Sequence, residues 1–126
     1  EDLVEEIRFE REYSQEPRKL AEILASERKL FKQVWYNRHW NLRVAIDRGQ
    51  HKVVSSADYH DAGPKAWRTM TIDTVWELAL AGAKRAEDEL GPDDVGPWSD
   101  FEWGMINGKL SALRWVLGDE WDMLDT

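Results

Sequence analysis

A group of histidine and carboxylate side chains is the first place to look for chemistry in this sequence. Asp58, His60 and Asp61 lie close together, and His51 lies a few residues upstream. Carboxylate oxygens and imidazole nitrogens bind divalent metal ions, so the segment is a hypothetical metal site. Its spacing matches no established metal motif, and we expect the residues on a loop. The sequence therefore favours solvated loop residues over a metal site.

Basic and aromatic side chains alternate over residues 35–43, a mixture that can stack on nucleobases and neutralise phosphates. On a helix, however, Trp35 joins the apolar stripe, and Tyr36 and Trp40 project together from the opposite side. We therefore expect Tyr36 and Trp40 to form an outer aromatic patch used in dimer contacts. No nucleic-acid partner is expected for a chain this acidic.

Carboxylates spaced three residues apart on facing helices hold magnesium in all-helical nucleotide pyrophosphohydrolases. This chain offers Asp2 with Glu5, and Asp119 with Asp122 and Asp125, outside its well-predicted helices. It has no P-loop, Gly-x-Gly-x-x-Gly or Gly-x-Ser-x-Gly motif. The sequence thus gives no support to an enzyme and predicts no cofactor. A metal-dependent helical hydrolase or a nucleotide-binding domain stays open as the main alternative function.

The C-terminal residues 119–126 alternate acids with large apolar side chains. Trp121, Met123 and Leu124 are candidates for insertion into a groove of a partner protein, with the acids steering the encounter. The other interpretation, which we favour, is that the tail folds back over its own core. An acidic helical protein can also imitate nucleic-acid charge, so a nucleic-acid-binding or DNA-mimic accessory protein is a third functional alternative.

Charge is distributed unevenly along the chain, whose net charge is −8. Residues 1–17 carry a net charge of −5, residues 18–52 carry +6 and residues 53–126 carry −9. The simplest interpretation places the basic segment against its acidic neighbours. The absence of cysteine excludes disulfides and thiolate catalysis. No apolar run approaches the roughly 20 residues that span a bilayer, so we expect a soluble, cytoplasmic protein without a membrane partner.

Apolar residues recur at helical spacing over residues 17–49, which predicts one long helix ended by Gly49. A hairpin with strands at 40–46 and 51–54 is the competing interpretation. Residues 50–70 are rich in polar residues, glycine and proline and are expected to form a connecting loop. The next helix is predicted from Thr71 to Leu90, where Gly91 and Pro92 end it.

The last predicted helix begins after Ser99, whose side chain can form a capping box with Glu102, and ends at Gly118. Two of its sides are apolar: Phe101, Met105, Ala112 and Val116 on one, and Ile106, Leu110, Leu113 and Leu117 on the other. Such a helix is expected at the centre of the fold. Glu102 projects between these two sides and must either reach solvent or find a partner. If it is buried, we expect it to pair with Arg38 or another base of the long helix.

Small residues mark the facing sides of the last two helices. They are Gly104, Gly108 and Ala112 in the last helix, and Ala79, Gly82 and Ala83 in the one before it. Each helical glycine costs about 1 kcal/mol relative to alanine, so we expect close helix packing to compensate. The prediction is a single all-α domain over residues 1–126, with an arm at 1–16 and a tail at 119–126. It has three to four helices: a long helix in its N-terminal half and a close-packed C-terminal helical hairpin.

Together these patterns favour a small helical protein that acts through protein–protein interaction and self-association. A homodimer is the expected assembly, and a further protein partner is a hypothesis that the acidic, aromatic tail suggests.

Overall fold

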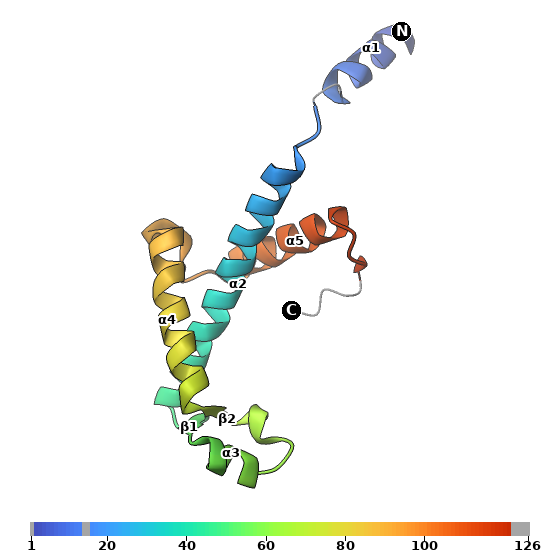
Figure 1. Cartoon of the computed structure of the whole chain (residues 1–126). Coiled ribbons are helices and arrows are strands. Elements are labelled where there is room, and N and C mark those ends of the chain that lie inside the picture. The colour runs from blue at the N-terminus through green and yellow to red at the C-terminus, as the bar shows by residue number, and fades with distance from the viewer. Residues whose placement is uncertain (1, 14–15, 122–126) are drawn as a thin grey trace.

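The computed structural model describes residues 2–13 and 16–121 (Figure 1). In chain order its elements are α1 (Asp2–Tyr13), α2 (Leu20–Asp47), β1 (Lys52–Val54), α3 (Ser56–Asp61), η1 (Ala66–Arg68), β2 (Met70–Ile72), α4 (Asp73–Leu90), η2 (Pro92–Asp94) and α5 (Asp100–Val116). The predicted all-α class is confirmed in its coarse form: the fold is mostly helical, but β1 and β2 form a small parallel sheet. Within the described ranges there are five α-helices, more than expected, because short α3 forms where a loop was predicted.

The long helix α2 is the element against which α4 and α5 both pack. Its apolar residues continue at helical spacing to Asp47, so the helix predicted for residues 40–47 is confirmed and the competing hairpin is not formed. Gly49 follows in the turn with φ of 74°, a backbone conformation that glycine adopts without the strain of a side chain.

Both α4 and α5 pack against α2, and the core consists of two clusters along it (Figure 1). One cluster contains Val34, Ile106 and Leu110 with Leu30, Trp98 and Trp103 around them. The other contains Tyr36, Ala83 and Ala86, surrounded by Trp35, Leu90 and Val95. The expected close-packed hairpin of α4 and α5 is wrong. The large side chains of α2 bury more apolar area against α4 or α5 than the small residues of α4 and α5 would bury against each other.

Residues 50–70 are more ordered than the predicted loop. Strands β1 and β2 pair in parallel, with Lys52 opposite Met70 and Val54 opposite Ile72, and α3 and η1 connect them. Each strand has three residues, which is too short for an alternating pattern to show in the sequence.

The chain exposes more surface than a compact monomer of its size. Its accessible surface is 10002 Å², whereas a compact 14.8 kDa monomer is expected to expose about 7,000 Å². Part of the difference comes from α1, which extends beyond the N-terminal end of α2 and away from the other helices (Figure 1). Exposed apolar side chains on the larger helices, among them Leu78 and Phe101, also contribute to the exposed surface.

Candidate interaction surface

The N-terminus of α5 is fixed by the predicted capping box. The Ser99 hydroxyl accepts a hydrogen bond from the Glu102 amide at 3.1 Å, and the Glu102 carboxylate accepts one from the Ser99 amide at 3.0 Å. Hydrogen bonds of the Glu102 carboxylate to the backbone and then to the side chain of Ser99 favour the charged form and lower the pKa of Glu102. Glu102 is exposed and its carboxylate turns back to its own helix end, so the burial on which the expected pairing with Arg38 depends does not occur.

The side of α5 that contacts α2 holds the helix in place. Leu110 is 1% exposed and packs with Ile106 against Val34 of α2. Near the other end of α5, the Arg114 Nε lies 3.3 Å from the Glu27 Oε1, with both side chains mostly buried. The ion pair that sets the α2–α5 register thus has its base on α5 and its acid on α2, the reverse of the expected arrangement.

The opposite side of α5 is apolar and uncovered. Phe101 is 77% exposed, Met105 45%, Trp115 49% and Val116 55%. At about 100° per residue they project away from Leu110, on the same side as three small residues. We call this set the outer face of α5: Phe101, Gly104, Met105, Gly108, Ala112, Trp115 and Val116. The expected central position of α5 is wrong, because α2 covers one of its two apolar sides and the described chain leaves the other open.

The small residues of α4 and α5 have different surroundings. On α4, a Cβ added at Gly82 would lie 3.4 Å from the Trp35 ring, and Ala83 is fully buried. Ala79 is half-buried on the same helix. On α5, a Cβ added at Gly104 or Gly108 would meet no atom of residues 2–13 and 16–121 within 4 Å. The expected use of Gly104 and Gly108 in packing within the chain is therefore wrong.

An aromatic pair extends the outer face at its C-terminal end. The rings of Trp115 and Trp121 stack with centroids 5.1 Å apart, and Trp121 stays 54% exposed. Gly118, with φ of 110°, lies in the turn after α5 that leads the chain back toward the helix. The described part of the tail therefore folds back onto α5. Met123 and Leu124 lie outside the described residues.

A groove of about 850 Å³ lies beside the outer face, between α5 and the N-terminal half of α2. Phe101 and Met105 border it together with Ile23 and Leu30 of α2. Its other lining residues are Arg18, Glu22, Ser26, Lys29, Gln33, Asp94, Trp98, Glu102, Ile106, Lys109, Ala112 and Leu113. The apolar surface of α5 thus continues into a concave region with a charged rim.

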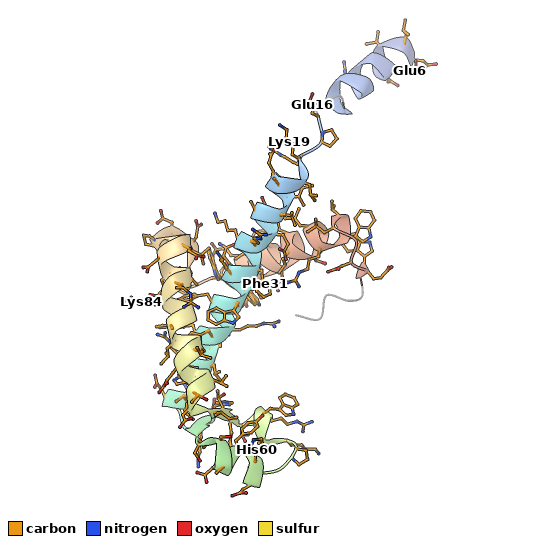
Figure 2. All side chains as sticks on the ribbon, in the orientation of Figure 1. Glu6, Glu16, Lys19, Phe31, His60 and Lys84 are labelled. Atoms are coloured by element: carbon orange, nitrogen blue, oxygen red, sulfur yellow. The ribbon has the colours of Figure 1, made fainter. Side chains whose placement is uncertain are left out.

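The histidine and carboxylate group predicted as a metal-site hypothesis is not assembled. His51 is buried and its Nε2 lies 2.7 Å from the Thr71 hydroxyl, and burial lowers its pKa. Asp58, His60 and Asp61 lie on α3, at the end of the molecule far from α5 (Figure 2). Across the described ranges, no three His, Cys, Asp or Glu side chains are grouped so that they could hold a metal ion.

Tyr36 belongs to the core and not to an outer patch. It is 7% exposed, and its hydroxyl donates a hydrogen bond of 2.5 Å to the Glu87 carboxylate of α4. Burial, this bond and the carboxylate charge raise the pKa of Tyr36 to about 12. The predicted exposure is wrong for Tyr36. Trp40, by contrast, is 48% exposed, and the guanidinium of Arg43 lies 4.9 Å from its ring centroid.

His39 is a buried polar residue that the sequence patterns did not single out. Its ring stacks between Trp35 at 5.2 Å and Trp76 of α4 at 5.1 Å. Its Nε2 accepts a hydrogen bond of 2.9 Å from the Arg43 Nε. Burial, followed by the charge of Arg43, lowers the pKa of His39. Trp35, His39 and Arg43 are four residues apart, and this spacing predicts that they lie on one face of a helix.

The basic segment of α2 lies against acidic residues of the following elements. Lys29 pairs with Asp94 of η2 at 3.1 Å, and Lys32 pairs with Glu89 of α4. These contacts support the interpretation that the charges of residues 18–52 meet acidic neighbours in the same chain.

Comparisons with protein-family models, curated proteins and solved structures found no match for this chain. In the described part of the chain, no helix combines the length and apolar character needed to cross a bilayer.

Proposed function

We propose that this chain is a protein–protein interaction domain that self-associates, with the outer face of α5 as its contact surface. The observation that carries the proposal is the exposure of Phe101, Met105, Trp115 and Val116 along one helix face that contains no charged residue. Contiguous apolar surface of this kind on a folded chain is typical of protein contact sites.

The excess surface area supports the same function. The chain exposes about 3,000 Å² more than a compact monomer of its mass. Obligate homodimers bury on the order of 2,000 to 5,000 Å² in total, or half of that from each copy. Covering the outer face and the adjoining groove is therefore compatible with an interface of ordinary size, even though α1 contributes part of the excess.

A matched pair of substitutions tests the contact surface. Phe101→Asp places an acid in the first turn of α5, where the helix dipole favours it, so the helix itself is preserved. Leu78→Asp makes the same chemical change on α4, where Leu78 is 73% exposed. Molar mass is measured by light scattering after size-exclusion chromatography, and circular dichroism checks the helix content of each variant.

We expect the unmodified chain and Leu78→Asp to have twice the 14.8 kDa mass of one chain. Phe101→Asp should be monomeric at the same concentration, because burial of a phenylalanine contributes about 1.5 to 3 kcal/mol and a buried acid adds a further cost. A monomeric unmodified chain would contradict self-association. Dissociation by Leu78→Asp alone would place the interface on α4.

A further inference from the structure

Five of the seven residues of the outer face of α5 are arranged symmetrically about Gly108. Gly104 and Ala112 lie four residues before and after it, and Phe101 and Trp115 lie seven residues before and after it. These five positions run large, small, small, small, large in either direction, whereas Met105 and Val116 have Ser111 and Asp100 at their mirrored positions. The five symmetric positions can match a reversed copy of themselves.

We infer that the outer face of α5 binds the same face of a second copy of this chain, with the two α5 helices antiparallel and crossing at Gly108. This inference rests on the proposed function and names the partner and its orientation. Gly104 of one copy then lies opposite Ala112 of the other, and Phe101 lies opposite Trp115. The pair has a two-fold axis, the commonest symmetry among soluble homo-oligomers.

The space needed for a second helix is present at the centre of the face. A Cβ added at Gly104 or Gly108 meets no atom of the described residues within 4 Å, and Ala112 is exposed. Small residues at all three positions let two helix backbones approach closely. The approach would offset the loss of helix propensity that each glycine imposes on α5.

The ends of the face match by aromatic contact. Trp115 already stacks on Trp121, and both rings stay about half exposed. In the antiparallel pair, Phe101 of one copy reaches this indole pair of the other copy at each end of the interface. Aromatic pairs with centroids about 4.5 to 7 Å apart add stabilisation beyond the area they bury.

The helix dipoles favour the antiparallel direction over the parallel one, because they are aligned favourably when the two helices run in opposite directions. The acids do not distinguish the two directions, since Asp100 and Glu102 lie in the first turn of α5 and Asp119 and Glu120 follow its other end.

Cysteine cross-linking tests the register directly, because the chain contains no cysteine. Three single variants, Gly104→Cys, Gly108→Cys and Ala112→Cys, each add a small side chain to the seam and leave Phe101 and Trp115 in place. Lys84→Cys on α4 is the control for random collisions (Figure 2). Each variant is oxidised alone, and Gly104→Cys is also refolded and oxidised together with Ala112→Cys.

We expect Gly108→Cys to form a disulfide-linked dimer by itself, since the two residues meet at the axis. Gly104→Cys and Ala112→Cys should stay unlinked when alone, because identical positions are about 12 Å apart along the helices, beyond the Cα separation of about 4.4 to 6.8 Å that a disulfide spans. The mixture of these two variants should form a linked dimer. Lys84→Cys should link at least tenfold more slowly than Gly108→Cys.

Other patterns overturn the inference in separate ways. Self-linking of Gly104→Cys and of Ala112→Cys means that the helices are parallel. A dimeric mass without linkage of Gly108→Cys, or with linkage no faster than in Lys84→Cys, places the contact elsewhere. Either result leaves self-association intact, whereas a monomeric mass for the unmodified chain contradicts the proposed function itself.

Discussion

Helices α4 and α5 both carry small residues along one side, yet the structure uses the two sides differently. On α4, Gly82 lies under the Trp35 ring and Ala83 is fully buried, so the small side chains admit the large side chains of α2. On α5, a Cβ added at Gly104 or Gly108 would meet no atom within 4 Å in the part of the chain that the structure describes. Small residues at helical spacing therefore indicate close approach without identifying the neighbour. For α5, we propose that the neighbour is another chain.

The largest expected effect comes from the inner side of α5. Leu110→Ala should lower the free energy of unfolding by about 2 to 5 kcal/mol, because it leaves a cavity at a fully buried position. Met105→Ala on the outer face is the matched control and should change the unfolding of the monomer much less, since Met105 is 45% exposed. Urea denaturation at low protein concentration measures both. Equal losses would mean that the two sides of α5 do not differ as described.

Glycine substitutions on α4 and α5 test whether the small residues of the two helices contact different neighbours. Gly82→Leu should destabilise the monomer by about 1 to 3 kcal/mol, because the added side chain crowds the Trp35 ring. Gly108→Leu should instead stabilise the monomer by up to about 1 kcal/mol through higher helix propensity, while shifting the molar mass toward that of one chain. Urea denaturation and light scattering report the two effects. An unchanged mass for Gly108→Leu would remove Gly108 from the interface.

The helix cap provides a smaller effect that is confined to α5. Ser99→Ala should cost about 1 kcal/mol of unfolding free energy, because the Glu102 amide loses its acceptor. The pKa of Glu102 should rise toward its ordinary value, since part of the hydrogen bonding that lowers it is lost. Carboxyl NMR titration and urea denaturation measure the two changes. Asp100→Asn, in the same turn but outside the cap, is the control.

The smallest effect concerns pH and the α2–α4 contact. The folded chain holds the pKa of His39 below 6.5, chiefly by burial. In the unfolded chain His39 has its ordinary pKa of about 6.5, so it binds a proton at a higher pH than it does in the folded chain. The stability that neutral His39 contributes is therefore complete above pH about 6.5 and is lost as the pH falls from there toward the folded pKa. The melting temperature should decrease from pH about 7.5 to about 5.5. His39→Phe, which keeps the stacked ring, should reduce the decrease and leave the share of His51. An unchanged pH dependence in this variant would exclude His39 as a cause.

Local patterns could be predicted from the sequence where a few neighbouring residues decide the outcome. Ser99, Glu102 and Gly118 define both ends of α5, and the apolar spacing of α2 predicts its length because each signal acts within one or two helical turns. Helical spacing in the sequence also predicts the two apolar sides of α5.

Which surfaces meet could not be predicted, because that depends on residues distant in sequence. The small side chains of α4 and α5 match each other in size, yet the aromatic and aliphatic side chains of α2 bury more area against each helix. Helical spacing places Tyr36 outside, opposite Trp35, and it does not indicate that Glu87, which lies far along the chain, is its partner. The three-residue strands β1 and β2 carry too few residues for a pattern.

Sedimentation equilibrium of the unmodified chain over a series of concentrations tests most directly whether a second copy of this chain covers the outer face of α5. The molar mass should rise with concentration to twice 14.8 kDa and go no further, as expected for a closed two-fold pair. A mass of one chain at every concentration would contradict it.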